Sequence, residues 1–169
     1  MISVRAESAE DYSAVRRINE LAFGGPSEAA LVDALRETAH PHLSLVAIID
    51  GQVVGHIFFS PVSVESEASA FTAMALAPMA VLPDHQKQGI GSLLIEAGLQ
   101  ECQRIGHYIV VVLGHPEYYP RFGFTPARQR ELRCEYAVPD EVFMVAELMP
   151  GALGGRQGLV RYRPEFNDV

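Results

Sequence analysis

Hydrophobic residues follow two spacings along this 169-residue chain, and the spacing changes at glycines and prolines. Apolar positions three and four residues apart are typical of helices with one buried face, whereas alternation or a short apolar run is typical of strands. The first part of the chain predicts a strand over Ile2–Ala6, a helix from the Ser8 N-cap to Phe23, and a helix from Ser27 to the residue before His40-Pro41. Asp11 stands three residues after Ser8, which supports the first helix start.

A hairpin is expected next. Asp50-Gly51 separates two β-rich runs, Leu43–Ile49 and Val53–Phe59, and glycine tolerates the positive φ that a tight turn requires. Pro61 is expected to end the second run. Val62–Val64 is a candidate to extend the sheet beyond that break.

The next part predicts two strands on either side of a helix. Phe71–Leu82 is an apolar strand interrupted by Pro78, which implies a bulge or the end of pairing on one side, because proline donates no ladder hydrogen bond. A helix is expected over Ser92–Arg104, and Tyr108–Leu113 has the fully apolar character of a strand covered on both faces. The remaining elements are a short helical turn between Pro116 and Gly123, and strands Val142–Leu148 and Leu159–Tyr162 separated by the glycine-rich loop Gly151–Gly158.

The element order is therefore β-α-α-β-β-β-α-β-α-β-β. Two parallel crossovers within this order predict an α/β fold with a mixed sheet (α+β in character). Because the chain has no internal repeat and no long linker, residues 1–169 are expected to form a single domain.

Composition narrows the class of protein. A net charge of −8 argues against a nucleic-acid-binding surface, although backbone amides can still bind an anionic cofactor. No apolar run is long enough for a membrane span, and the N-terminus lacks a signal-peptide core. The two cysteines, Cys102 and Cys134, are not closely spaced, so neither a disulfide framework nor a cysteine-rich zinc site is expected. We therefore expect a cytoplasmic protein, a monomer or a homodimer.

A glycine-containing turn, Gln86-Lys87-Gln88-Gly89-Ile90-Gly91, lies between the apolar strand and the following helix. Glycines there let the backbone approach a ligand and direct successive N–H groups toward one point. The free N–H groups and positive dipole end of the helix favour an anion. The turn lacks the Gly-Lys-Ser/Thr ending of a Walker loop. It also lacks the third glycine of a dinucleotide fingerprint, because Leu94 occupies that position, three residues after Gly91. Alone, this element fits either an anion site or a purely structural turn.

In this setting the chain resembles the GNAT superfamily of acyl-CoA N-acyltransferases, whose signature Gln/Arg-x-x-Gly-x-Gly/Ala follows the fourth strand and opens the third helix. Gln86–Gly91 matches that signature, and Pro78 marks a bulged fourth strand. The segment Tyr119–Phe124 matches the family's ending after the fifth strand. Leu113–Tyr119 is similar to a bacterial subgroup of predicted N-acetyltransferases. The resemblance covers roughly residues 1–126, and the tail from Arg128 onward matches by strand pattern only.

The resemblance implies a GNAT-type fold, a central twisted mixed sheet with a bulged fourth strand and helices on both faces. It also implies acetyl-CoA as co-substrate, with amides of the turn on the pyrophosphate and backbone groups of the fourth strand on the pantetheine. The cofactor-binding residues expected on this basis are Met79, Ala80, Val81, Gln86, Lys87, Gln88, Gly89, Ile90, Gly91 and Ser92. Lys87 is expected mainly as a solvated charge.

Acyl transfer to an amine needs a deprotonated amine, a polarised thioester carbonyl and a proton for the departing thiolate. By resemblance, Tyr119 occupies the family's general-acid position. A tyrosine with a pKa near 10 can protonate a thiolate whose thiol has a pKa of about 8.5. Aromatic packing in a short helix is the alternative for Tyr119, and Tyr118 is expected to be core or substrate wall.

The general base is harder to assign. The segment Phe71–Leu82 contains no ionisable side chain, so the carboxylate often found on that strand in GNAT enzymes is absent. The candidates are Glu28, His56, His115 and Glu117. Glu28 is also explained as a complement to a helix dipole, His56 as a satisfied interior histidine, and His115 as a loop hydrogen-bonder. Proton removal through ordered water stays open. Metal binding is not expected, because no histidines form a ligand-spaced pair on a helix.

Three functions are compatible with these residues. The main prediction is an enzyme that transfers an acetyl or acyl group from acetyl-CoA to a primary amine of a small molecule or protein, by direct attack with Tyr119 as general acid. The alternative is a non-catalytic acyl-CoA-binding or regulatory module. Nucleotide phosphate binding is weakened by the missing Walker residues. We expect the acceptor site between the Phe23–Glu28 loop and the Gly151–Gly158 loop, with the glycines allowing a mobile lid.

Overall fold

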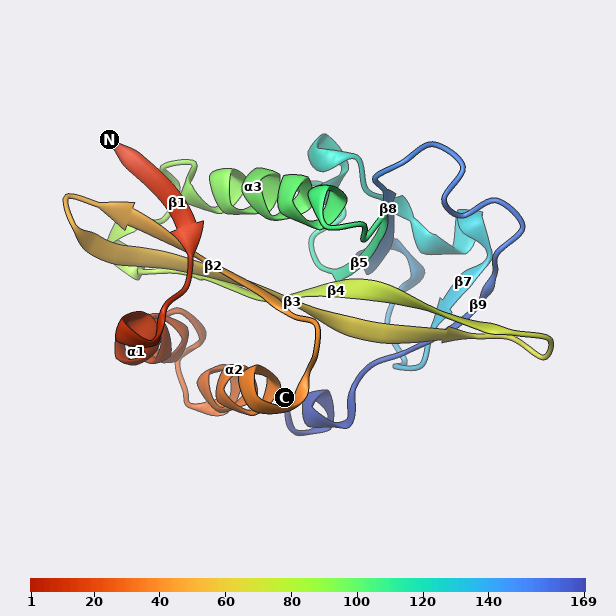
Figure 1. The fold of residues 1–169 in the computed structure, drawn as a ribbon, viewed down its shortest axis with the longest axis horizontal. Coiled ribbons are helices and arrows are strands. Elements are labelled where there is room, and N and C mark those ends of the chain that lie inside the picture. The colour runs from red at the N-terminus through yellow and green to blue at the C-terminus, as the bar shows by residue number, and fades with distance from the viewer. The chain divides into compact units, whose positions relative to one another are not determined.

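A computed structural model describes all 169 residues (Figure 1). The α-helices are α1 (Tyr12–Phe23), α2 (Ser27–Thr38) and α3 (Ile90–Arg104). The strands are β1 (Ile2–Ala6), β2 (Leu43–Ile49), β3 (Gln52–Glu65), β4 (Ala70–Val81), β5 (Ile109–Leu113), β6 (Thr125–Pro126), β7 (Leu132–Cys134), β8 (Phe143–Glu147) and β9 (Gly158–Arg161). Short 3₁₀ helices join them: η1 (Ala9–Asp11), η2 (Pro83–His85), η3 (Tyr119–Phe122), η4 (Ala127–Arg130), η5 (Asp140–Val142) and η6 (Pro164–Asp168).

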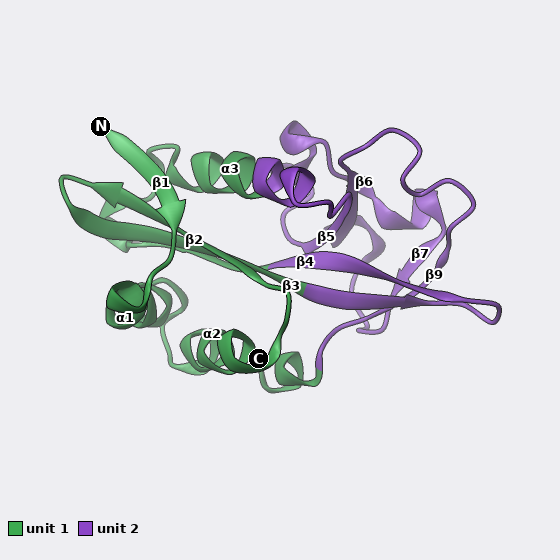
Figure 2. Cartoon of the chain, in the orientation of Figure 1, with its two compact units in different colours: residues 1–60, 77–98, 164–169 green, residues 61–76, 99–163 purple.

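The chain divides into two compact units (Figure 2). Unit 1 contains residues 1–60, 77–98 and 164–169, and unit 2 contains residues 61–76 and 99–163. The boundaries fall within β3, β4 and α3, so each of these three elements contributes residues to both units.

Unit 1 is built on an antiparallel arrangement of β1, β2 and β3. Leu45 of β2 pairs with Ala6 of β1 on one side and with Ile57 of β3 on the other. Asp50 and Gly51 form the turn with φ values of 50° and 79°, which confirms the hairpin expected there.

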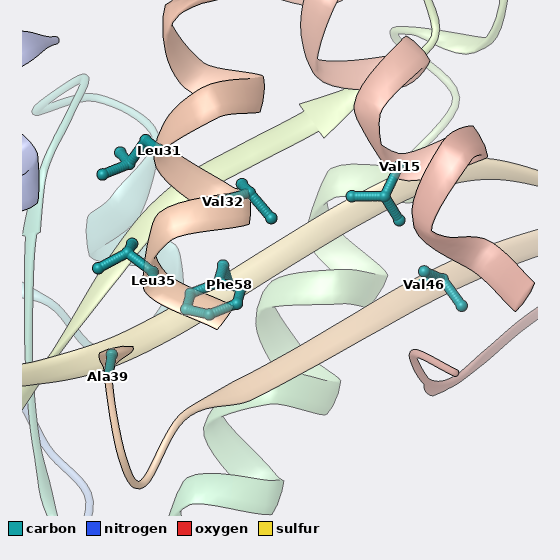
Figure 3. Close-up of a cluster of buried hydrophobic side chains, with 7 residues drawn as sticks. All are labelled: Val15, Leu31, Val32, Leu35, Ala39, Val46 and Phe58. Carbon is teal, nitrogen blue, oxygen red and sulfur yellow. The ribbon is translucent and has the colours of Figure 1, made fainter. Parts of the chain in front are cut away.

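Alternation along β3 gives each face of unit 1 its own helices. Phe58 faces α1 and α2, where it joins a buried cluster shown in Figure 3: Val15, Leu31, Val32, Leu35, Ala39, Val46 and Phe58. The neighbouring Phe59 faces the other way, toward Gly98 of α3. Gly55 points to that same helix, next to Ile90 and Leu94. The strand is therefore buried on both sides.

Unit 2 is built around the apolar strand β5. Met74 and Ala75 of β4 pair with it in parallel, and β8 pairs with it antiparallel along its whole length. β6 follows β8 on the far side, while β9 pairs with the end of β3 and with β7. The mixed sheet with three helices confirms the fold class expected from the sequence.

Two expected element boundaries were wrong, and two short strands were not expected, whereas the extension of the sheet over Val62–Val64 is present. β3 does not stop at Pro61 but continues to Glu65, because Pro61 falls between the part paired with β2, which ends at Phe59, and the part paired with β9, which begins at Ser63. Neither β2 nor β9 pairs with Pro61 itself, so these two partners require no N–H there. The short strands β6 and β7 were not expected, and α3 begins at Ile90 rather than Ser92. No helix has the length and apolar character needed to cross a membrane.

Candidate functional site

The turn between β4 and α3 has the backbone conformation of an anion-binding loop. Lys87 and Gly89 both lie in the left-handed region, with φ values of 63° and 85°, and α3 starts at Ile90. Alternating backbone conformations of this kind direct neighbouring N–H groups to the same side of the chain. A Cβ built on Gly89 meets no protein atom within 4 Å, so the space beside it is open.

The N–H groups of this turn donate to no backbone carbonyl. At the start of α3, Leu93 N donates to Gly89 O over 3.1 Å, and the amides of Lys87 to Gly91 donate to no backbone carbonyl. Unsatisfied amides at a helix start carry the positive end of the helix dipole. The structure therefore presents a row of donors suited to a phosphate or pyrophosphate.

Gln86 acts on the turn through its side chain. Its Nε2 donates to the carbonyl of Val81, at the end of β4, over 3.1 Å. Gln88 Nε2 contacts the Asp84 carbonyl at 3.5 Å, the outer limit of a hydrogen bond. The Lys87 side chain is exposed and forms no ion pair, as expected for a solvated charge.

The end of β4 carries the other residues expected to bind the cofactor. Ala80 is buried, whereas Met79 and Val81 are half-buried. Pro78 precedes them, and the pairs of β4 with β5 are at Met74 and Ala75, before the proline. The pattern agrees with the end of pairing that Pro78 predicts.

Tyr119 lies in an aromatic cluster that follows β5. Its ring is perpendicular or nearly so to the rings of Tyr118 and Phe124, with centroids 5.2 and 5.6 Å away. Only 8% of the residue is exposed. Burial raises the pKa of Tyr119 to about 12. The side chain is therefore packed, and its hydroxyl stays protonated at neutral pH.

His56 is not suited to be a general base. It is fully buried, its Nδ1 lies 3.3 Å from Asn19 Nδ2, and its Nε2 lies 2.9 Å from Ser44 Oγ. Since Asn19 Nδ2 also donates to the Val15 carbonyl, the amide presents N–H to His56, which makes Nδ1 the acceptor and leaves the proton on Nε2. Burial lowers the pKa of His56 to about 3. Of the two interpretations from sequence, the satisfied interior histidine holds.

The other candidate bases are accessible. Glu28 is half-buried at the first turn of α2 and forms no hydrogen bond or ion pair. His115 and Glu117 are exposed in the loop between β5 and η3, where the His115 carbonyl accepts from Tyr118 N and Tyr119 N. No group of three or more His, Cys, Asp or Glu residues is arranged to hold a metal ion.

The Gly151–Gly158 loop is fixed by hydrogen bonds. The Glu147 carboxylate accepts from Leu153 N at 2.6 Å, and the Gln103 side chain donates to the Leu148 carbonyl at 2.8 Å. The hydrogen bond from the Leu153 amide, with further donors, lowers the pKa of Glu147. The loop borders a cavity of about 370 Å³ beside His107 and Tyr108, at the start of β5. Gly151, Gly155 and Gly158 have positive φ and serve tight turns, and the mobile lid expected here stays a prediction.

Two sets of contacts at these places were missed from the sequence. Gly114 lies directly against the Tyr119 ring, and Asn19 and Ser44 hold His56. The motif Leu113–Tyr119 was a signal for the first, whereas the partners of His56 come from elements distant in sequence and left no local pattern.

Comparison with known proteins identifies this arrangement. Residues 3–127 match the family model described as an acetyltransferase (GNAT) domain. The chain is 38% identical over 165 residues to the uncharacterized N-acetyltransferase YhbS of Escherichia coli strain K12, covering 97% of this chain and 98% of that protein.

Two solved structures are similar over nearly the whole chain. The crystal structure of E. coli YhbS in complex with CoA has a TM-score of 0.90 and 36% identity, covering 98% of this chain and 92% of that one. A GNAT-family acetyltransferase from Brucella melitensis in complex with acetyl-CoA has a TM-score of 0.79 and 35% identity, with 98% of each chain covered.

Proposed function

Because this chain belongs to the GNAT family and is an acetyl-CoA-dependent N-acetyltransferase, we propose that it acetylates a primary amine of a small molecule or protein, with Tyr119 as general acid. The observation that carries the proposal is the row of N–H groups over Lys87–Gly91 that donate to no backbone carbonyl. Such a row fits a pyrophosphate, the anionic part of CoA. The side-chain chemistry is then assigned residue by residue.

Cofactor binding is proposed at the turn and the end of β4. Amides of Gln88, Gly89, Gly91 and Ser92 hold the pyrophosphate, and Ile90 opens the helix whose dipole supports it. Met79, Ala80 and Val81 offer backbone groups to the pantetheine in the manner of an added strand. Gln86 supports the site by tying the turn to Val81, and Lys87 contributes a solvated charge near it.

Acetyl-CoA, when bound, supplies a thioester carbonyl. A neutral amine forms the C–N bond as the C–S bond breaks, so the amine loses one proton and the CoA sulfur gains one. Tyr119 is proposed to donate toward the departing sulfur, because its hydroxyl stays protonated at neutral pH. The proton of the amine is proposed to leave to Glu28 or His115, directly or through water. Glu28 is a half-buried carboxylate without an ion-pair partner.

The first experiment measures CoA release from acetyl-CoA in the presence of a panel of amines and peptides, with mass analysis of the products. We expect at least one amine to accelerate release and to gain an acetyl group. Binding of acetyl-CoA without acceleration by any amine would support the non-catalytic acyl-CoA-binding module instead. Acceptors that share a charge or an apolar group would define the substrate class.

We also propose that the protein acts in the cytoplasm. Both cysteines, buried Cys102 and half-buried Cys134, are free thiols, as is usual in a reducing cytoplasm. Sedimentation of the purified protein would show whether it is a monomer or a homodimer.

A further inference from the structure

We infer that Gly114 is a positioning residue for catalysis, because its lack of a side chain leaves the space that the Tyr119 ring occupies. The inference rests on the proposed function of Tyr119 as general acid. Gly114 follows the last residue of β5, five residues before Tyr119.

The contact between the two residues leaves no room for a methyl group. A Cβ built on Gly114 would lie 2.2 Å from Tyr119 Cε2 and 2.8 Å from Cδ2. Side-chain carbons do not approach one another this closely, so the ring or the backbone would have to move. The φ of Gly114 is not in the left-handed region, unlike that of Gly123 at 94°. Space, and not backbone conformation, is therefore what demands glycine at position 114.

The backbone of Gly114 has little freedom to withdraw. Leu113 pairs with Phe143 in the ladder between β5 and β8, and Gly114 N donates to the Val142 carbonyl at 3.0 Å. The hydrogen bond continues the strand pairing by one residue past β5. The position of Gly114 is thus set by the sheet of unit 2.

The ring is also held on its other sides. Phe124 is 1% exposed and contacts it edge-on with a centroid distance of 5.6 Å and an angle of 80°. Tyr118 contacts it at 5.2 Å and 79°, and Phe122 at 6.5 Å and 61°. A Cβ at position 114 would push the ring against these neighbours, and the shift would be transmitted along the rigid ring to the hydroxyl. Displacement of a reacting group by about 1 Å can cost roughly 10²-fold in rate.

A double-mutant cycle with Tyr119→Phe tests the inference. The assay is CoA release from acetyl-CoA with hydroxylamine as a small surrogate acceptor, since departure of the thiolate is common to every acceptor. We expect Gly114→Ala to lower kcat by roughly 10- to 100-fold, with the KM for acetyl-CoA within a few-fold. In the Tyr119→Phe background the same substitution should lower kcat by no more than about two- to three-fold, because the hydroxyl it misplaces is already gone.

Gly98→Ala is the matched control. Its Cβ would lie 2.4 Å from Phe59 Cε1, so it inserts a methyl group against an aromatic ring outside the catalytic segment. We expect a lower Tm with kcat of the folded enzyme within a few-fold of wild type. If Gly114 had a purely structural role, Gly114→Ala would likewise lower Tm and leave kcat within a few-fold of wild type.

The outcomes distinguish failure of the inference about Gly114 from failure of the proposed general-acid role of Tyr119. Wild-type turnover of Tyr119→Phe alone would refute the proposed acid, and the inference with it. A slow Tyr119→Phe enzyme together with normal turnover of Gly114→Ala, or with losses that multiply in the double variant, would overturn the inference alone. If Gly114→Ala does not fold, Phe124→Leu removes another wall of the ring and takes its place in the same cycle, with the same criteria.

Discussion

The environment of Tyr119 determines what its hydroxyl can do. Burial raises its pKa to about 12, whereas an unperturbed thiol has a pKa of about 8.5. Complete transfer of the proton to a thiolate with that ordinary pKa is uphill by about 3.5 pKa units, or about 5 kcal/mol. Removing water from around the thiolate also raises the pKa of the thiol, which reduces the difference between the two pKa values. The proposed acid therefore acts late in C–S cleavage, as a donor to the charge that develops on sulfur.

Replacing Tyr119 by phenylalanine keeps the ring contacts with Phe124 and removes only the hydroxyl. We expect kcat to fall by roughly 10²-fold, the lower range for loss of a general acid, while the affinity for acetyl-CoA stays within a few-fold. Steady-state kinetics and calorimetry measure the two quantities. A packing role predicts the opposite pattern, with kcat near wild type in Tyr119→Phe and loss of stability in Tyr119→Ala.

The pH profile of kcat offers an independent check on Tyr119. The acid must be protonated to donate, and a pKa raised to about 12 keeps it protonated at least to pH 10.5. We therefore expect no alkaline loss of kcat from this group between pH 8 and 10.5, where a tyrosine with an ordinary pKa near 10 would already lose activity. An alkaline limb with an apparent pKa near 10 that is absent from Tyr119→Phe would contradict this.

At the scale of elements, local signals in the sequence were sufficient where one segment determines its own conformation. The Asp50-Gly51 hairpin and the turn from Gln86 to Gly91 are of this kind, since φ requirements and helix ends are local. The sequence indicated more sheet over Val62–Val64, but not that one unbroken strand, β3, runs through Pro61. Its pairing partner there, β9, lies about a hundred residues further along the chain, and no local pattern encodes it.

The glycine turn predicts a specific loss of cofactor affinity. Gly89 has a φ of 85°, which a β-branched residue adopts only with strain, and its open side is where the ligand is proposed to approach. We expect Gly89→Val to weaken acetyl-CoA binding by at least tenfold in calorimetry, with the protein folded. Lys87→Ala is the comparison, and should change the affinity much less, because amides and not that side chain carry the contact. Unchanged affinity of folded Gly89→Val would refute the assignment.

The start of α1 predicts an acid-sensitive contribution to stability. The Asp11 carboxylate accepts from Arg5 Nη1 at 2.7 Å and from Ser8 N at 2.8 Å, and the Arg5 hydrogen bond above all lowers its pKa to about 2. A depressed pKa means that the stabilisation is complete above pH 4 and is lost as pH falls from about 4 to 2. We expect Asp11→Asn to lower Tm by about 2–5 °C at pH 7. Thermal melts should show the difference from wild type disappear near pH 2.

At the scale of the whole molecule, the sequence predicted a mixed sheet with one dominant family signature, and the comparisons confirm both. The structure of the C-terminal part of the chain was less predictable from the sequence. Family resemblance stopped near residue 126, and the short strands β6 and β7 have two and three residues, too few for a periodic signal. The prediction of a single domain over residues 1–169 stays a prediction.

Thermal unfolding with acetyl-CoA tests that last expectation. β3, β4 and α3 each contribute residues to both units. Because unfolding one unit would also remove hydrogen bonds from the parts of these elements that belong to the other unit, we expect one cooperative transition. The proposed cofactor residues all belong to unit 1, yet acetyl-CoA at about 100 times its Kd should shift the entire transition, by about 2.7 kcal/mol or roughly 5–10 °C. Gly89→Val should remove the shift without abolishing folding. Two calorimetric transitions, of which acetyl-CoA moves only one, would show instead that the two units unfold independently.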